Sequence, residues 1–495
     1  MTIEEEVQHL LKEIGPGKMS NTAYDTAWVA RLGEVDWELS NQALNWLCEH
    51  QLSDGSWGAE QPFYYHDRVI STLSAMIALT YRGRRAKDRF QIEKGLQALE
   101  RITSGATQGL ASDPNGATVG FEMIAPTLVA EAEKLGIIQR QGERILGRLG
   151  RLRIKKMDKL KGQKINRFVT PAFSIEMAGL DGKAILDIDN LQESNGSIAN
   201  SPSATAYFAM HLKHNDPEAM AYIRKWTSTN GGVPDVAPFD IFEPAWALWN
   251  LQLISGWSAE TITLFQRHLD YLQKHWNNDT GIGHASEYTP KDSDDSGLVL
   301  ELMLRFNREA NLDAIFCYEE SEYFRCFALE ANPSISANIH VLGALRQACF
   351  DRKHPSIQKI LLFLRSMQNE DGYLLDKWHV SPYYTTSHAI IACIGYDDVI
   401  CSKAIEWILE SQNANGSWGL YRPNAEETAY AIQALVIWKR SGNSVSTECI
   451  DRGIDWLNQN SAPPYEPLWI GKALYCPEFV VRSAILSAQS LAREG

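Results

Sequence analysis

Three aspartates within four positions form the most chemically informative pattern in the chain. Asp292, Asp294 and Asp295 come just before an apolar run that begins at Leu298, which predicts that the carboxylates lie at the N-terminus of a helix. In an enclosed site the three carboxylates cannot all stay ionised, because burial and mutual repulsion raise the pKa of at least one of them. The pattern therefore predicts one carboxylic acid that is protonated at neutral pH, with two neighbours that orient it.

Two other interpretations apply to the same cluster. A solvated helix cap would use these residue types without any enclosure. A calcium loop fits at first, since Asp292, Asp294, Ser296 and Gly297 fall on the first, third, fifth and sixth positions of an EF-hand. The twelfth position, which requires a bidentate glutamate, is Met303, and this excludes the EF-hand. The choice between a cap and a buried acid depends on whether the chain builds a cavity around the cluster.

The composition is that of an acidic globular protein. The 495 residues are 44% hydrophobic and 22% charged, enough for two domains, and the net charge of −14 argues against nucleic acid as a partner. No apolar run reaches the roughly 18 residues that a membrane helix needs, so no integral membrane segment is predicted. The eight cysteines include no CxxC pair, and the acidic N-terminus has no signal-peptide core. These features predict free thiols and a cytoplasmic protein.

A polar turn that contains glycine and often an aromatic residue recurs along the chain. Clear copies are 51–58, 191–197, 368–373 and 412–419. A separation of roughly 45 to 50 residues, with helical spacing of apolar residues between the turns, is typical of helical hairpins that close into (α/α) barrels. We expect these turns to be structural. The predicted fold is all-α: an N-terminal helix in 1–19 that packs on the second barrel, a first barrel in 20–252, and a second barrel in 253–495 that carries the aspartates.

A neutral aspartic acid in an apolar cavity is a Brønsted acid that can protonate an alkene. Aromatic faces would stabilise the resulting carbocation, and the enclosure would keep water away from it. The 15 tryptophans and 18 tyrosines are more than a core needs and favour such a cavity. Taken singly, each candidate is more often a core residue than a cavity wall. The candidate lining residues are Trp378, Tyr383, Tyr384, Trp418, Tyr421 and Trp469.

At this point the sequence resembles a known family. Residues 292–295 (DSDD) match the DxDD motif of class II terpene cyclases, and further motifs follow the order found in class II diterpene cyclases along nearly the whole chain. These motifs are 23–28 (AYDTAW), 66–68 (HDR), 119–122 (VGFE), 201–206 (SPSATA) and 426–430 (EETAY). Within the family, the chain is most similar to bacterial enzymes that make tuberculosinyl (halimadienyl) or kolavenyl diphosphate.

The resemblance implies a fold and an assignment of roles. It implies two helical barrels in a βγ arrangement with the active site between them, and geranylgeranyl diphosphate as the substrate. By motif, Asp294 is the general acid, while Asp292 and Asp295 sustain its protonation. Asn338 falls where the family places an amide that orients the acid, and the alternative is an amide satisfied within the core.

The anchor of the diphosphate is less clearly marked in the sequence. There is no glycine-rich phosphate loop, so scattered cations or a metal must hold the group. Lys472, in 467–472 (PLWIGK), resembles a family stretch and is the candidate cation, with a surface lysine as the alternative. Plant relatives carry an acidic cluster associated with magnesium before the VGFE motif, where this chain keeps only Asp113. Mg²⁺ is therefore expected to arrive with the diphosphate, and no tight protein site for it is predicted.

A second departure concerns the last step of the reaction. Plant copalyl diphosphate synthases use a His–Asn pair to position the water that removes the final proton, and this chain has Ile175 and Asp235 at the corresponding places. The change predicts a rearranged halimadane or clerodane skeleton, with a copalyl-type product as the alternative. The product is expected to pass to a class I terpene synthase or a transferase.

Other functions fit the sequence less well. An (α/α)-barrel glycoside hydrolase needs a second acid across a groove. A protein prenyltransferase subunit needs an Asp/Cys/His zinc site, and no cluster of that kind is visible. A class II cyclase acting on a prenylated substrate without a diphosphate stays open as an alternative.

Overall fold

Helix follows helix along almost the whole chain in the computed structural model, which describes all residues except 1, 83, 84, 105–115, 140, 148, 161, 331 and 495. The first part comprises β1 (Asn21–Thr22), α2 (Ala23–Val29), η1 (Leu32–Glu34), α3 (Trp37–Glu49), α4 (Tyr65–Arg82), α5 (Ala86–Thr103), α7 (Phe121–Lys134), α8 (Gln141–Leu146), α9 (Leu149–Asp158), η2 (Thr170–Ala178), η3 (Lys183–Ile185), η4 (Ile188–Asn190), α10 (Pro202–Tyr207), η5 (Phe208–Leu212), α11 (Pro217–Trp226) and β2 (Val233–Pro234). The second part comprises α1 (Ile3–Glu13), α12 (Phe242–Leu251), α13 (Ala259–His275), α14 (Ser293–Arg305), α15 (Asp313–Phe316), α16 (Ile335–Gln347), α17 (Pro355–Met367), α18 (Pro382–Cys393), α19 (Asp398–Glu410), α20 (Ala425–Arg440), α21 (Thr447–Gln459), β3 (Trp469–Ile470), β4 (Leu474–Tyr475) and α22 (Glu478–Glu494).

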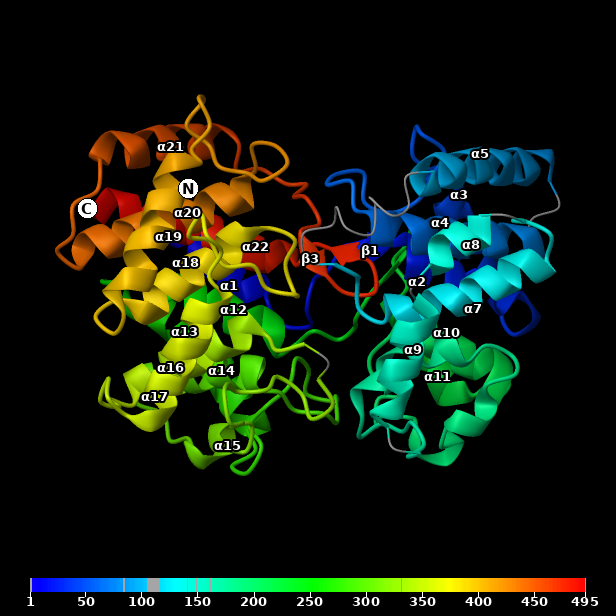
Figure 1. Cartoon of the computed structure of the whole chain (residues 1–495), viewed down its shortest axis with the longest axis horizontal. Coiled ribbons are helices and arrows are strands. Elements are labelled where there is room, and N and C mark those ends of the chain that lie inside the picture. The colour runs from blue at the N-terminus through cyan, green and yellow to red at the C-terminus, as the bar shows by residue number, and fades with distance from the viewer. Residues whose placement is uncertain are drawn as a thin grey trace.

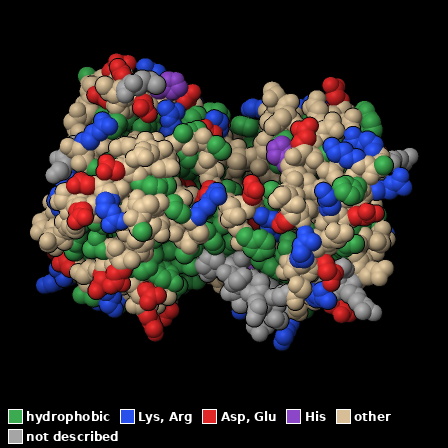
Figure 2. Space-filling view, turned by 90° about the horizontal axis from the view of Figure 1, so that it is seen from above, with side chains coloured by type: hydrophobic (Ala, Val, Ile, Leu, Met, Phe, Trp, Pro, Cys, Tyr) green, Lys and Arg blue, Asp and Glu red, His purple; other side chains and the backbone are tan. Residues whose placement is uncertain are grey.

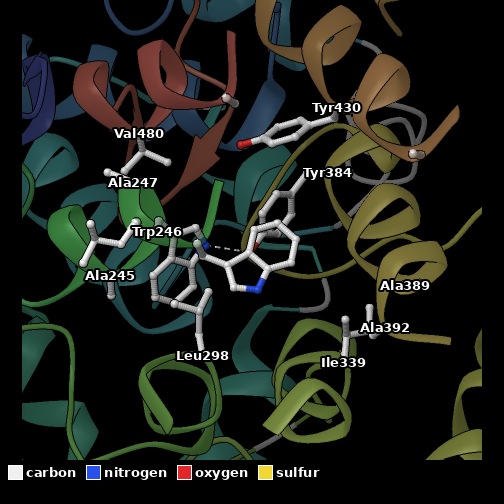
Figure 3. Packing of buried hydrophobic residues seen from close by; sticks show 14 of the residues in the cluster. Ala245, Trp246, Ala247, Leu298, Ile339, Tyr384, Ala389, Ala392, Tyr430 and Val480 are labelled. Atoms are coloured by element: carbon white, nitrogen blue, oxygen red, sulfur yellow. Dashed lines mark hydrogen bonds between the residues drawn. The ribbon is translucent and has the colours of Figure 1, made fainter. Parts of the chain in front are cut away.

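The inner helices of the second part form a closed ring. Going round it, α12 packs on α14, α14 on α16, α16 on α18, α18 on α20, α20 on α22, and α22 again on α12. Helices α13, α17, α19 and α21 lie outside this ring, and α1 packs against α13 and α22. Buried side chains such as Leu298, Ile339 and Val480 fill the ring from its different helices (Figure 3). The predicted (α/α) barrel is confirmed here.

A second, shorter ring makes the other lobe. Helices α2, α4, α7, η2 and α10 contact each other in that order, and α10 returns to α2. The lobes lie side by side, with both chain ends in the second lobe (Figure 1). Seen from above, a furrow marks the junction of the lobes, and acidic and basic side chains are spread over both of them (Figure 2).

The hydrophobic cores place the boundary between the lobes earlier than expected. The core of the first lobe is built from residues between Ala23 and Val233, joined by Ala285, Tyr288 and Ala473. The core of the second lobe begins at Val236 and also includes the buried residues of α1. The sequence placed this boundary at residue 252, which assigned α12 to the wrong lobe. Helix α12 belongs to the second lobe because it completes that lobe's inner ring.

The recurrent turns hold the hairpins together. Gln412 donates from its amide to the carbonyl oxygens of Gly416 and Cys449, at 2.8 Å each, and so joins a turn to the next outer helix. The indole N–H of Trp418 donates to the carbonyl of Ile408 at 2.7 Å, beneath the same turn. Equivalent bonds to the carbonyl four residues later are made by Gln51, Gln192 and Gln368. The turns therefore close the barrels, as the sequence predicted.

Two further observations concern the cysteines and the lengths of the helices. All eight cysteines are free. Within the described part of the chain, every helix is too short or too polar to pass through a bilayer.

A short hairpin connects the lobes. Strands β3 and β4 pair antiparallel, with Trp469 opposite Tyr475, and they lie between the lobes in Figure 1. On one side, Trp469 bridges to His379 of the second lobe. On the other, the carbonyl of Gly471 accepts from the backbone N–H of Val119 in the first lobe at 2.8 Å. We call residues 468–476 the bridging hairpin.

Candidate active site

The three aspartates lie where the sequence places them, at the start of α14. Asp292 caps the helix, and its side chain accepts a hydrogen bond from the backbone N–H of Asp295 at 2.8 Å. Asp292, Asp294 and Asp295 are only 1%, 7% and 5% exposed, which rules out a solvated cap. Asp294 is the most accessible of the three. The cluster is therefore enclosed, and Asp294 keeps the most contact with solvent.

Two side chains of α16 hold the carboxyl group of Asp294. His340 Nδ1 lies 2.5 Å from Oδ1 of Asp294, and the Ser336 hydroxyl donates to Oδ2 at 2.7 Å. The Ser336 hydroxyl also lies 3.3 Å from Oδ2 of Asp376, a fourth buried carboxyl. Each carboxyl oxygen has two lone-pair directions, so Asp294 keeps free directions for an acidic proton after these contacts.

Burial favours protonation of the carboxyls that lie around Asp294. It raises the pKa of Asp292 to about 7, and the charge of Asp294 adds to the effect. Burial also raises the pKa of Asp295 well above its ordinary value, reinforced by the charges of Asp292 and Asp294. The pKa of Asp376 is raised by burial and again by the charge of Asp294. Because the groups titrate together, the proton belongs to the cluster. The site retains acidic protons at neutral pH.

The expected role of Asn338 needs correction. Its amide oxygen accepts from the backbone N–H of Phe324 at 2.8 Å, and its NH₂ donates to the carbonyls of Phe324 and Ser334. No hydrogen bond joins Asn338 to Asp294. Residues 334 and 338 share one face of α16, while Ser336 and His340 share another. Asn338 is thus the satisfied core amide, and the two residues that contact the acid lie two positions on either side of it.

Aromatic side chains surround the acid and its histidine. The ring of Trp246, on α12, meets that of His340 edge-on with centroids 5.4 Å apart. The indole N–H of Trp246 donates to the hydroxyl of Tyr384 at 2.9 Å, the dashed line in Figure 3. Tyr384 in turn contacts Trp469, with ring centroids 4.8 Å apart. Of the predicted lining residues, Tyr384 and Trp469 thus belong to the aromatic contacts that extend from His340 through Trp246. Trp246 was missed because nothing in its local sequence marks it.

The other aromatic candidates lie elsewhere. Tyr383 packs on Trp407 of the outer helix α19 at 4.6 Å, since neighbours on a helix point about 100° apart and Tyr384 takes the inner direction. Trp418 lies beneath a turn, and Tyr421 is 39% exposed. Trp378 stands beside Phe327, with ring centroids 6.2 Å apart.

Lys472 is not available to a ligand. Its ammonium group is fully buried and lies 2.7 Å from Glu176 Oε1, 2.7 Å from the Ser201 hydroxyl and 2.6 Å from the Ser203 hydroxyl. An ammonium group has three donors, and all three are used inside the protein. This arrangement contradicts the expected contact between Lys472 and a diphosphate.

Two more carboxyls complete this assembly, which we call the interlobe lysine cluster (Asp25, Glu176, Ser201, Ser203, Asp235 and Lys472). Asp235 accepts from the backbone N–H of Lys472 at 3.2 Å. Burial raises the pKa of Asp235 well above its ordinary value, and the charge of Asp25 adds to this. Burial raises the pKa of Asp25, while the charge of Lys472 opposes the shift. The AYDTAW and SPSATA motifs thus converge on the bridging hairpin and not on the acid.

Two other lysines lie at the junction of the lobes. Lys159 reaches from the first lobe to the carbonyl of Glu330 in the second at 2.6 Å. Lys377 follows Asp376 in the chain, binds the carboxylate of Glu330 and donates to the carbonyl of Asn332 at 2.9 Å. Sequence reasoning missed both lysines. A basic run from 151 to 164 in an acidic protein could have pointed to Lys159. Lys377 could have been found because it directly precedes the candidate Trp378.

Metal ligands do not converge in the part of the chain that the structure describes. No group of three or more His, Cys, Asp or Glu side chains there is arranged to hold a metal ion. Asp113 lies outside the described residues.

Comparisons with known proteins agree on one family. Residues 326–469 match the squalene-hopene cyclase C-terminal domain. The chain is 50% identical over 483 residues to a type B diterpene cyclase of Mycobacterium tuberculosis, with 96% of each chain covered. It is 31% identical over 390 residues to an ent-copalyl diphosphate synthase of Zea mays, covering 76% of this chain and 45% of that protein. The structure of ent-copalyl diphosphate synthase from Streptomyces platensis matches the whole chain with a TM-score of 0.80 at 27% identity.

Proposed function

Because this chain belongs to the class II, or type B, diterpene cyclases, we propose that it protonates geranylgeranyl diphosphate and cyclises it to a bicyclic diterpene diphosphate. The proton goes from Asp294 to the terminal double bond, and the neighbouring double bonds supply the electron pairs for two ring closures. Loss of a proton from the final cation leaves a product with the same atoms as the substrate. The carbon–oxygen bond to the diphosphate does not break, so the diphosphate is retained.

One observation carries the proposal: Asp294 is a buried carboxyl beside Asp292 and Asp295, whose pKa values burial raises, and it is held on both oxygens by Ser336 and His340. Such a group can donate a proton in a fixed direction without first collecting it from water. Trp246 meets His340 edge-on, and Tyr384 and Trp469 continue the aromatic contacts from it. We expect the faces of these rings to stabilise a cation and to keep water away from it.

For the diphosphate, we propose an anchor made by Lys377 and Lys159 in place of Lys472. Both lysines lie at the junction of the lobes, and Lys377 is adjacent in sequence to Asp376, which shares the Ser336 hydroxyl with Asp294. Their partners include backbone carbonyls of 330 and 332, which a diphosphate could replace as acceptors. Mg²⁺ would be carried in with the diphosphate, where it would neutralise part of its charge.

The product we propose is a rearranged halimadane or clerodane skeleton, with the labdane (copalyl) type as the alternative. Two features support this. Ile175 is fully buried and apolar, and Asp235 is engaged with the backbone of Lys472, so neither position offers the His–Asn pair that holds a water in the plant enzymes. A cation that is not quenched early can undergo hydride and methyl shifts.

We propose further that the reaction takes place in the cytoplasm, and that a class I terpene synthase or a transferase consumes the product.

The test is incubation of purified protein with geranylgeranyl diphosphate, with and without Mg²⁺, followed by phosphatase treatment and mass-spectrometric product analysis. Wild type should give a bicyclic alcohol, and Asp294→Asn should lose at least about 100-fold in rate. Asp189→Asn makes the same change at an exposed aspartate and should leave the rate unaltered. Recovery of unchanged geranylgeraniol from wild type would contradict this substrate, and an active Asp294→Asn variant would contradict the acid.

A further inference from the structure

The contacts of the acid continue into a second histidine that the proposed reaction does not use. Beyond Asp294, His340 Nε2 lies 3.0 Å from Nδ1 of His388 on α18. His340 and His388 are 1% and 0% exposed. Asp294, His340 and His388 thus form a continuous, buried series of hydrogen bonds that connects α14, α16 and α18.

The surroundings of His388 are almost entirely aromatic. Its ring stacks on that of Trp249, with centroids 3.9 Å apart and planes 17° apart, and contacts Tyr384 at 4.4 Å. Its Nε2 has no hydrogen-bond partner among the described residues. Burial lowers the pKa of His388 well below its ordinary value. His388 is therefore neutral and carries a single N–H.

The position of that proton follows from the unpaired nitrogen. If the proton were on Nε2 of His388, a buried N–H would have no acceptor. If the proton is on Nδ1, it is donated to His340, and only a lone pair at Nε2 is left unused. Buried N–H groups without a partner are much rarer and more costly than underused acceptors. The Nδ1–H form of His388 is therefore the favoured one.

This fixes the direction of every hydrogen bond in the series. His340 Nε2 must accept from His388, so the proton of a neutral His340 lies on Nδ1 and is donated to Asp294 Oδ1. We propose that His388 is a positioning residue that sets the tautomer of His340 and thereby keeps the acidic proton of Asp294 free for the substrate. This inference rests on the proposed function, since it concerns the same acid.

Without the donor on His388, His340 is free to carry its proton on Nε2. Its Nδ1 would then accept the proton of Asp294, and that proton would point at the histidine and away from the alkene. Because His388 has no contact with the substrate in this scheme, the loss should appear in kcat and leave KM unchanged.

Two substitutions separate this role from packing. His388→Phe keeps a ring between Trp249 and Tyr384 but removes the donor. His388→Asn loses the ring but places an amide N–H where Nδ1 stood. We expect kcat to fall about 10- to 100-fold in His388→Phe with KM within about 2-fold, and to stay within about 3-fold of wild type in His388→Asn. The opposite order, or equal losses in both variants, would overturn the proposal.

The tautomer itself can be read without catalysis. Long-range ¹H–¹⁵N spectra of protein labelled at histidine, with the His340 signals assigned through His340→Gln, should show Nδ1–H alone in wild type and in His388→Asn, and a new Nε2–H population beside Nδ1–H in His388→Phe. An Nε2–H signal for His340 in wild type would overturn the inference even if His388→Phe failed to fold. Absence of a cyclic product from wild type would overturn the proposed function instead, so the two failures are distinguishable.

Discussion

Replacement of Lys472 by methionine tests whether this residue is a structural cation or a substrate anchor. The substitution keeps the length of the side chain and removes the ammonium group that binds Glu176, Ser201 and Ser203. Glu176 and Lys472 are both completely buried, so a carboxylate would be left in the interior without its cation. Removing one partner of a buried pair costs about 3–5 kcal/mol. Asp25, whose pKa the charge of Lys472 holds down, loses the same cation, which places the expected value towards the upper end.

The assay is urea unfolding at pH 7, followed by tryptophan fluorescence and circular dichroism. Lys472→Met should lower the free energy of unfolding of the transition that includes the first lobe. Lys472→Met combined with Glu176→Gln should recover part of the loss, because the unpaired charge is removed as well. The matched control is Lys12→Met, which breaks the exposed pair with Glu260 and should cost no more than about 1 kcal/mol. A loss below about 1 kcal/mol for Lys472→Met, together with a large rise in KM, would refute this reasoning and restore Lys472 as an anchor.

Two further predictions concern the acid and the turns. We expect kcat/KM to fall as the pH rises through about 7. Burial lets Asp292 keep its proton up to that pH, and the negative charge left when the proton is lost weakens Asp294 as a donor. A pH–rate profile that is flat from pH 6 to 9 would contradict this. We expect Trp418→Ala to destabilise the second lobe by about 3–5 kcal/mol, measured by urea unfolding, because the indole fills a turn. The products made by the folded fraction should stay the same in product analysis, because Trp418 lies outside the site.

The sequence predicted the fold through features that repeat. The glutamine-containing turns share a recognisable sequence pattern, and the structure shows one physical cause for it. The glutamine amide closes the turn and bonds it to the next helix. The boundary at 252 was wrong because the turn before α12, at 226–232, lacks the glutamine of the clear copies and so does not mark the start of the second lobe. Which ring a helix completes is a property of the whole barrel and cannot be read from its own residues.

The site was only partly predictable for a related reason. Asp292, Asp294 and Asp295 are adjacent in sequence, so their spacing alone predicted a cluster. The partners of Asp294 come from α16, where the choice among neighbouring polar residues depends on the rotation of the helix. The sequence offered two pairs at helical spacing, Ser334 with Asn338 and Ser336 with His340, and only packing decides which pair faces α14. Asp376 carried no signal at all, because it is a single acid in a loop.

The bridging hairpin bears on the order in which the protein can be made. Its residues leave the ribosome after every residue of the first lobe, yet the backbone N–H of Leu474 donates to Asp67, and Lys472 is the cation for Glu176. During synthesis, the first lobe therefore emerges with buried carboxyls whose partners have not yet been translated. It can collapse early but cannot reach its final packing until the C-terminal segment arrives. A nascent chain halted shortly before residue 468 should therefore present a first lobe that proteases can still digest, although every residue of that lobe has already been made.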